Sequence, residues 1–341
     1  MNLQALNNRS MAFKEVCFNQ ATLLLANKTI FTYQLKTMKQ FVLTLIFSLA
    51  IGWGFANTID SLHSDQQVLD FVVRLDKRFR SSENVKMTIQ PTDTLVKKLD
   101  CQGIAKQWNI RSWEKADFNH DDKTDLLVYV YWYNQFYLFT VMDNGNNTFK
   151  TLWLTKDHYE PCQLAKPVMV ENQQFLLYYA RKHRMKSMTE FIDTSTIDTL
   201  VYMKGNFVEL NRKPAKYHIK SIKFRTSGCF GTCPIFELNI AADGTAKYVA
   251  EGYNPKQGSF KGKLSPNRLQ ELLSLINYIN IKKLQDNYQV NWTDDQTGNL
   301  SIQFTDGSTK SIRDYGMQGT FGLSLLYNML SALRESETWH N

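Results

Sequence analysis

Apolar and polar residues alternate through much of the last third of the chain, which is the pattern of strands that bury one face. The alternation begins at Ile222 and Phe224, resumes at Phe236 and returns through residues 246–250 after an Asp243-Gly244 turn. An Asp-Gly pair between two alternating runs is a strong signal for a β-hairpin. We therefore predict that this region opens with a hairpin.

The same region then changes to helical spacing, back to alternation, and to helical spacing again. Ser265-Pro266 supplies an N-cap serine and a proline at the first helical position. A second hairpin follows around Asp306-Gly307, and a closing helix comes near the end of the chain. The apolar stripes are Leu269, Leu272, Leu273, Ile276 and Ile279 in the first helix, and Leu323, Leu326, Tyr327, Leu330 and Leu333 in the second. The order hairpin, helix, hairpin, helix predicts an α+β domain over residues 216–341.

Residues 57–215 show one helical stretch followed by a long series of strands. Val68, Leu69, Phe71, Val72, Leu75 and Phe79 recur at helical spacing and predict one amphipathic helix. Strand-like runs follow at 126–133, 136–141, 149–154, 168–170, 175–179, 199–203 and 207–210. We predict a second α+β domain here, an antiparallel meander with a packed helix. The polar stretch Asn211–Pro214 is the predicted linker between the domains.

The N-terminal region has the pattern of an export signal. Lys39 precedes an apolar run over residues 41–51, and small residues stand at Gly54 and Ala56. As a helix, residues 41–56 span about 24 Å, less than the ~30 Å of a bilayer core. We predict a signal peptide over residues 38–56 and an upstream artefact of start-site choice over residues 1–37. The mature protein is then expected in the periplasm or outside the cell, without a transmembrane anchor.

Composition and charge leave the class of partner open but make nucleic acid an unexpected one. Hydrophobic residues make up 43% of the 341, and the net charge is +8. Without residues 1–56, 35 basic residues stand against 31 acidic ones. No basic stripe with interleaved aromatic residues appears along the chain, which is the usual mark of a nucleic-acid-binding segment. The expected partner is an unidentified envelope or extracellular molecule.

Export changes how the cysteines are interpreted. Removal of the N-terminal segment takes Cys17 with it and leaves four cysteines, an even number in an oxidising compartment. The economical pairing is Cys229 with Cys233 and Cys101 with Cys162. On the chain-entropy model the long loop contributes roughly 4 kcal/mol and the short one about 2 kcal/mol. The short bridge is therefore either a local clamp or a reactive pair.

An acidic loop over Asp117–Asp125 precedes a strand and offers oxygen ligands of the kind that calcium prefers. The ligand set is Asp117, Asn119, Asp121, the carbonyl of Lys123, and Asp125. The stretch resembles the calcium loop of FG-GAP (integrin-type) repeats. It departs from that pattern at Asp122, where the family has a glycine in a left-handed turn. The resemblance implies a structural calcium ion; the alternative is a polar turn in which the aspartates bond backbone amides.

The segment Gly228–Pro234 holds two cysteines, two glycines and a proline between two predicted strands. Together with Asp243-Gly244 and Tyr248, Thr293-Asp294 and Asp314-Tyr315-Gly316, it resembles a bacterial domain family of unknown function found mainly in exported proteins. The resemblance covers about 115 residues from Ile222 onward. It implies a folding unit and an envelope setting, and it supplies no catalytic residue.

Three interpretations of the cysteine loop remain open. The first is a structural clamp that locks a tight turn. The second is thiol redox chemistry, which requires a nearby cation or helix N-terminus to lower a cysteine pKa. The third is copper binding with His218, because the spacing resembles that of SCO-type copper chaperones, although a predicted strand stands where those proteins have a helix. A separate hypothesis, for residues outside the cysteine loop, is acid–base chemistry by Asp294, Asp295, Asp314 and Tyr315.

The clamp is favoured because the compartment is oxidising and no base is predicted near the cysteines. Arg225 is close in sequence, but the strand predicted after Pro234 provides no helix N-terminus to lower a cysteine pKa. The sequence thus predicts an exported envelope protein acting as a non-enzymatic binding or structural module, with no catalytic residue assigned. The alternative is a periplasmic thiol-redox or copper-binding protein that uses Cys229 and Cys233.

Overall fold

The computed structural model describes residues 58–80, 86–157, 162–185 and 191–341. Residues Asn57–Asn341 cluster into one compact unit, distinct from Met1–Ala56. The predicted signal peptide (38–56) and the segment before it (1–37) lie outside the described residues. Within the described ranges, no helix has both the length and the apolar character that crossing a membrane requires.

The predicted amphipathic helix is present but shorter than its apolar spacing indicates. Helix α2 spans Asp65–Leu75 and buries Val68, Phe71 and Val72, and the Ser64 side chain caps its start. Phe79 belongs to a separate 3-10 turn, η1 (Lys77–Phe79), which the Asp76 side chain begins by accepting from the N–H of Arg78. Helices α3 (Thr92–Lys98) and α4 (Ile104–Gln107) follow and were not predicted.

The central region, for which a single meander is predicted, contains two four-stranded antiparallel meanders. The first consists of β1 (Trp113–Ala116), β2 (Asp125–Trp132), β3 (Gln135–Asp143) and β4 (Phe149–Trp153). The second consists of β5 (Gln163–Val170), β6 (Gln173–Met185), β7 (Phe191–Met203) and β8 (Asn206–Glu209). Lys204 and Gly205, between β7 and β8, both have positive φ and form the last turn of the second meander.

Strand β2 is buried on both faces, which explains its continuous apolar run. Leu126, Val128 and Val130 pack toward α2 and η1, whereas Leu127 and Tyr129 pack toward the second meander. The Tyr129 hydroxyl donates to the carbonyl O of Ala165 at 2.9 Å and accepts from the N–H of Ala165 at 2.7 Å. One buried side chain therefore joins the two meanders by hydrogen bonds to the backbone of β5. Strand β5 is at the edge of its sheet and contains Pro167, a position that tolerates proline.

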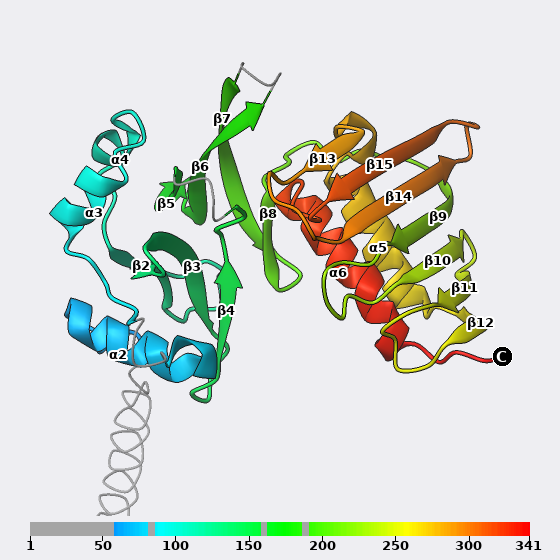
Figure 1. Ribbon diagram of the computed structural model, residues 1–341, viewed down its shortest axis with the longest axis horizontal. Helices are drawn as coiled ribbons and strands as arrows, with labels where there is room; N and C mark the ends of the chain where they lie inside the picture. Colours follow the sequence, from blue (N-terminus) through cyan, green and yellow to red (C-terminus); the bar gives the residue numbers. More distant parts are fainter. Residues whose placement is uncertain (1–57, 81–85, 158–161, 186–190) are drawn as a thin grey trace, which may run out of the picture. The chain divides into compact units, whose positions relative to one another are not determined.

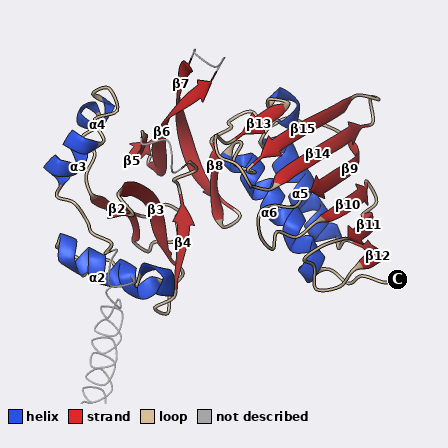
Figure 2. Ribbon diagram, in the orientation of Figure 1, coloured by secondary structure: helices blue, strands red, loops and turns tan. Residues whose placement is uncertain are grey.

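The C-terminal region forms a seven-stranded sheet in the order β12-β11-β10-β9-β14-β15-β13 (Figures 1 and 2). The strands are β9 (Ile219–Thr226), β10 (Phe236–Ala241), β11 (Thr245–Ala250), β12 (Gly258–Lys263), β13 (Asn287–Gln289), β14 (Thr297–Phe304) and β15 (Thr309–Tyr315). The helical elements are α5 (Pro266–Tyr278), η2 (Ile281–Lys283) and α6 (Phe321–Ser336). The predicted hairpins and helices are present, and β12 and β13 are additional strands.

Both long helices cover the same face of this sheet, as Figure 1 shows. Phe224, Leu238 and Leu300 alternate along their strands with exposed or half-buried neighbours. They belong to one core with Ile276 of α5 and Leu326 of α6. The opposite face of the sheet carries the polar residues of the alternation. This arrangement leaves that face open, because the described helices lie on the other side.

The predicted linker is tied to the C-terminal region. The N–H of Asn211 donates to the Tyr278 hydroxyl at 3.0 Å, and the N–H of Ala215 donates to the carbonyl O of Asn277 at 3.0 Å. Residues 211–215 therefore lie along the end of α5. The domain boundary at residue 215 stays a prediction.

Candidate functional site

The cysteine loop closes the hairpin between β9 and β10 at one end of the seven-stranded sheet. The Thr226 hydroxyl donates to the carbonyl O of Pro234 at 2.7 Å and accepts from the N–H of Phe236 at 3.2 Å. Thr226 is 1% exposed, so its hydroxyl is buried. A buried hydroxyl at the end of β9 thus fixes the base of the loop.

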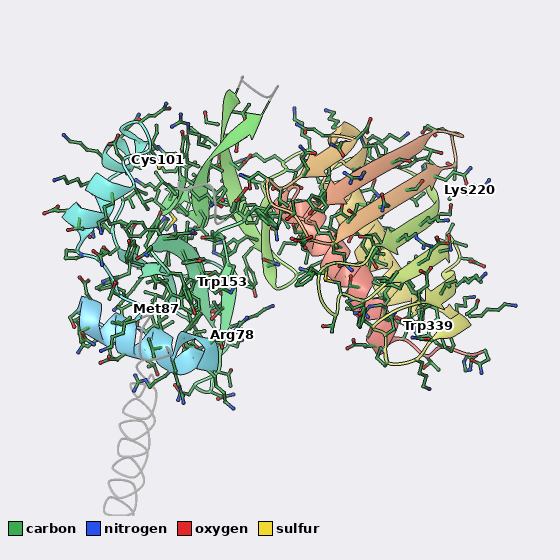
Figure 3. The ribbon with its side chains drawn as sticks, viewed as in Figure 1. Arg78, Met87, Cys101, Trp153, Lys220 and Trp339 are labelled. Atoms are coloured by element: carbon green, nitrogen blue, oxygen red, sulfur yellow. A yellow bond between two sulfur atoms is a disulfide. The ribbon has the colours of Figure 1, made fainter. Side chains whose placement is uncertain are left out.

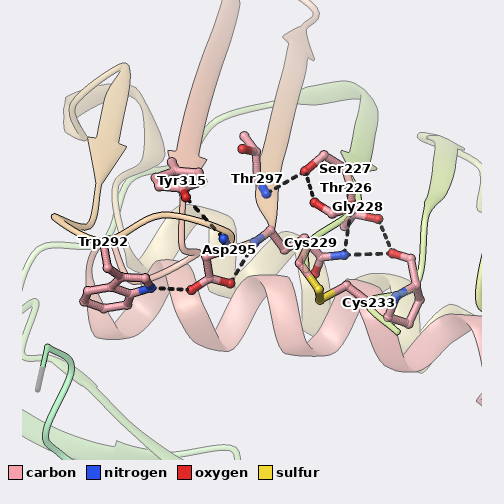
Figure 4. Close-up of a disulfide and its surroundings, with 11 residues drawn as sticks. Thr226, Ser227, Gly228, Cys229, Cys233, Trp292, Asp295, Thr297 and Tyr315 are labelled. Carbon is pink, nitrogen blue, oxygen red and sulfur yellow. Dashed lines mark hydrogen bonds between the residues drawn. A yellow bond between two sulfur atoms is a disulfide. The ribbon is translucent and has the colours of Figure 1, made fainter. Parts of the chain in front are cut away.

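Both predicted disulfides are present. Cys229 is bonded to Cys233 with their Cα atoms 5.7 Å apart (Figure 4), and Cys101 is bonded to Cys162 with their Cα atoms 5.4 Å apart (Figure 3 labels Cys101). In the short loop, Gly231 has a φ of +147°, which favours glycine. Its N–H donates to the carbonyl O of Cys229 at 3.0 Å.

The tip of the loop presents an aromatic side chain to solvent. Phe230 is 90% exposed, while its N–H donates to the carbonyl O of Asp294 at 2.9 Å. Tyr253, on the turn after β11, is 58% exposed. That turn is joined to the cysteine loop, because the N–H of Ile235 donates to the carbonyl O of Gly252 at 2.8 Å. We call residues 227–235, 251–254 and 292–297 together the cysteine-loop end.

Gln296 connects the cysteine loop to the segment before β14. Its side-chain Nε2 donates to the carbonyl O of Ser227 at 2.9 Å and to that of Pro234 at 2.8 Å. The N–H of Thr297 also donates to the Ser227 hydroxyl at 2.9 Å. Both ends of the loop are therefore held by one amide side chain, in addition to the disulfide.

The acidic residues proposed for acid–base chemistry have structural partners. One carboxylate oxygen of Asp295 accepts from Trp292 Nε1 at 3.0 Å, and the N–H of Asp295 donates to the Tyr315 hydroxyl at 3.1 Å (Figure 4). Asp314 is 1% exposed and accepts from the N–H groups of Gln318 and Gly319 at 3.2 and 2.9 Å. The structure brings Asp295 and Tyr315 together, and it uses Asp314 to bond the backbone before α6.

Three of the four sequence segments that carry the family resemblance meet at this end of the sheet. They are the cysteine loop, Thr293-Asp294, and Asp314–Gly316. The Asp243-Gly244 turn lies at the opposite end of β10. Tyr248 nevertheless reaches the cysteine-loop end, because its hydroxyl bonds Asn254 Oδ1 at 3.0 Å, and Asn254 Nδ2 donates to the carbonyl O of Ile235 at 2.7 Å.

A cavity of about 570 Å³ lies beside the disulfide. Cys233, Pro234, Asp295 and Gln296 contribute to its lining. The other lining residues come from β4 and the segment just after it, from the starts of β8 and β10, from the segment before α6 and from α6 itself. Its walls on α6 include Ser324, Asn328, Ser331 and Arg334. The mixture of hydroxyl, amide and charged groups suits a polar occupant rather than an apolar one.

The third copper ligand considered for the cysteine loop is wrongly placed. His218 precedes β9, whereas Cys229 follows it, so the eight residues of β9 separate them. At about 3.3 Å per residue, the strand alone holds them more than roughly 25 Å apart. The strand β10 also follows the loop, where the copper chaperones have a helix. His218 cannot complete a copper site with these cysteines in this fold.

The acidic loop joins β1 to β2, and its aspartates bond backbone amides. Asp117 accepts from the N–H groups of Asp121 and Asp122 at 3.2 and 2.9 Å. Asp125 accepts from the N–H of Phe118 at 2.9 Å and from that of Asp143 at 2.8 Å. Asp122 has a φ of +62°, so it adopts the left-handed turn in which the FG-GAP pattern has glycine.

A lysine of the loop supplies a positive charge among these carboxylates. Lys123 Nζ lies 2.7 Å from a carboxylate oxygen of Asp121, and this hydrogen bond raises the pKa of Lys123. The side-chain oxygen of Asn119 is buried and has no hydrogen-bond partner. A calcium ion would therefore find one free amide oxygen but would have to displace Lys123 from Asp121. Across the described ranges, no three His, Cys, Asp or Glu side chains are grouped to hold a metal ion, and calcium at this loop stays a prediction.

Burial governs the titration of Asp125. This carboxyl is 0% exposed. Burial raises its pKa to about 7, against the opposing effect of the two backbone amides, and the charges of Asp121 and Asp117 add to the increase. Asp125 is thus a buried polar residue at the start of β2, with both carboxylate oxygens bonded to backbone amides.

Gln296, Thr226 and Phe230 were not singled out from the sequence. Gln296 and Thr226 act through bonds to distant backbone groups, which leave no local pattern. Phe230 belongs to the loop motif, and its position between two cysteines in a tight turn is the sequence feature that could have indicated its exposure.

Comparison with known proteins gives a family match for the C-terminal region alone. Residues 220–334 match the model of a domain family described as Domain of unknown function (DUF6438). This match supports the resemblance that the cysteine loop and its companion segments indicated. No curated protein and no solved structure matches the chain.

Proposed function

We propose that this chain is an exported envelope protein whose C-terminal region binds a partner protein through the cysteine-loop end. The observation that carries the proposal is Phe230, which is 90% exposed at the tip of a loop held by a disulfide and by backbone hydrogen bonds. A large apolar side chain exposed to this extent has no role in the core. Its position on a fixed loop supports a role in contact with another molecule.

The fixed loop matters for affinity. Ordering a mobile loop on association costs free energy, and a loop already ordered avoids that cost. Rigid aromatic side chains are common anchors of protein interfaces. Phe230 and Tyr253 supply two such side chains on neighbouring turns, and the partner is expected to offer an apolar pocket to them.

The redox alternative has less support. A reactive thiolate needs a nearby cation or a helix N-terminus. Arg225, the cation nearest in sequence, forms ion pairs with Glu251 at 3.0 Å and with Glu237 at 3.7 Å. Strand β10 follows the cysteines, so the dipole of a following helix is absent at that position.

Site-specific photo-cross-linking in the producing cell tests the proposal. A benzoylphenylalanine at position 230 is expected to form one discrete protein adduct, and Tyr253→Ser is expected to weaken it. The matched control carries the probe at Ile197, an exposed apolar position on β7 (59% exposed). Absence of an adduct at 230, or the same adduct from 197, would overturn the binding role. Mass spectrometry of the exported chain separately tests processing after Ala56.

If the cysteines are redox-active instead, the intact protein should exchange its Cys229–Cys233 disulfide with mild thiol reductants. Mass spectrometry under non-reducing conditions measures this. A disulfide that resists mild reductant supports the clamp, and ready exchange supports the alternative.

A further inference from the structure

The open face of the seven-stranded sheet carries two rows of polar side chains. Strand register places Lys261, Lys247, Asn239, Lys223, Ser301 and Ser311 in one row, across six strands. It places Ser259, Val249, Glu237, Arg225, Asn299 and Arg313 in the next row. These two rows contain five cations and one carboxylate, Glu237. This concentration of positive charge is not evident from the sequence, because the five cations come from four separate strands.

The spacing of the cations follows from the sheet. Neighbouring strands lie about 4.8 Å apart, so Lys261 and Lys223, three strands apart, are separated by roughly 14 Å along the first row. Arg225 and Arg313, two strands apart, are separated by roughly 10 Å along the second. The positive charges are therefore spread across the sheet and not gathered at one point.

Three of the five cations form no ion pair with a described residue of the protein. Glu237 lies 3.0 Å from Lys223 and 3.7 Å from Arg225, which also pairs with Glu251. Within the described residues, Lys247, Lys261 and Arg313 have no ion pair, and all three are exposed. Across β9, β14 and β15 the face is also hollowed, with a volume of about 580 Å³.

The chemistry of the rows argues against three classes of ligand. Neither row contains an aromatic side chain, so the face lacks the stacking platforms of single-stranded nucleic-acid binders. Lysine is depleted from protein–protein interfaces, and aromatic anchors are enriched there. Val249 is the one aliphatic residue of the rows and is half-buried, so little apolar surface is available to enter a lipid bilayer.

We propose that this face binds an acidic polysaccharide. An extended polymer with regularly repeated carboxylates contacts several separated cations at once, so weak single contacts add to a useful affinity. Hydroxyl and amide side chains between the cations, such as Ser301, Asn239 and Asn299, suit the hydroxyl groups of sugars. This surface shares no residue with the cysteine-loop end, although Arg225 pairs with Glu251 at their border, and the proposal does not depend on a partner there.

Binding of alginate, a polymer of uronic acids, to the purified chain tests this proposal. We expect salt-sensitive binding to alginate and none to neutral dextran. The variant with Lys247→Gln, Lys261→Gln and Arg313→Gln is expected to bind alginate about tenfold more weakly. The control with Lys97→Gln, Lys106→Gln and Lys213→Gln loses the same charge at exposed positions elsewhere and should bind like the unaltered chain.

Three results would overturn the proposal. Equal weakening by the two triple variants would show a general effect of net charge. Tighter binding to a DNA oligonucleotide, or to vesicles with anionic lipids, would assign the face to a different ligand. Retention of alginate binding by the first triple variant, with an unchanged thermal melt, would place the binding site elsewhere.

Discussion

The Glu209 carboxylate, at the end of β8, accepts hydrogen bonds from the N–H of Phe321 at 2.5 Å and from that of Gly322 at 2.9 Å. Phe321 and Gly322 are the first residues of α6, and their N–H groups have no partner within the helix. A carboxylate at this end also interacts favourably with the helix dipole. One side chain of the second meander therefore completes the start of the helix that covers the C-terminal sheet.

Replacing Glu209 is expected to destabilise the whole described unit. Glu209→Gln keeps one acceptor and loses the charge, so it should lower the free energy of unfolding by about 1 kcal/mol; Glu209→Ala should cost about 2 kcal/mol. Urea unfolding measures both. Glu171→Gln is the control, because Glu171 pairs with Arg212 on the surface and should change stability by less than about 0.5 kcal/mol. Equal costs at the two positions would contradict the capping role.

The two disulfides are expected to differ in their contribution to stability. Cys101–Cys162 closes a loop of 61 residues and Cys229–Cys233 one of 4. Replacing the first pair by serine should cost about 4 kcal/mol and replacing the second about 2 kcal/mol on the chain-entropy model. Chemical unfolding of the two double variants gives the comparison. A larger loss from the short bridge would mean that the cysteine loop supports the sheet beyond closing its own turn.

Asp125 should make the folded state less stable as pH rises through neutrality. Its pKa is raised to about 7 in the fold, mainly by burial. The folded state therefore holds its proton at pH values where the unfolded chain, with a pKa near 3.9, has released it. From about pH 5 to about pH 8 this group should remove about 3 kcal/mol of stability.

Unfolding across this range, compared between the unaltered chain and Asp125→Asn, isolates the effect. The variant loses one acceptor and is less stable throughout, but its pH dependence should be flatter. Parallel curves for the two proteins would show that Asp125 titrates outside this range.

Calcium should act on the acidic loop only in competition with Lys123. Lys123→Gln removes the ammonium group that pairs with Asp121, so calcium should raise the melting temperature of this variant more than that of the unaltered chain. Thermal melts with calcium and with chelator measure both shifts. Magnesium, with its stricter geometry, is the control ion. If calcium leaves the melting temperature of both proteins unchanged, the loop is not a calcium site.

The strands of the C-terminal sheet were predictable where one face is buried. Phe236, Leu238 and Ile240 are buried and alternate with half-buried neighbours, so the sequence carries the period of the strand. Strand β12 was missed because Phe260 is its only buried residue, and β13 because it has three residues.

The division of the central region into two meanders was not predictable from local pattern. Each strand of a meander has the same alternation whichever sheet it joins. The division depends on contacts such as that of Tyr129 with Ala165, 36 residues apart. The same holds for the candidate site, where the cysteine motif was visible but the bonds from Gln296 across 62 and 69 residues were not.

Pro167 bears on how this protein avoids joining other chains through β5. An edge strand presents unpaired backbone groups, which another extended chain can use to add itself to the sheet and begin aggregation. Proline has no N–H to donate, so β5 offers an interrupted ladder to any incoming strand. Pro167 thus makes self-association through this edge of the second meander less favourable. The pairing of β5 with β6 is maintained at the same position.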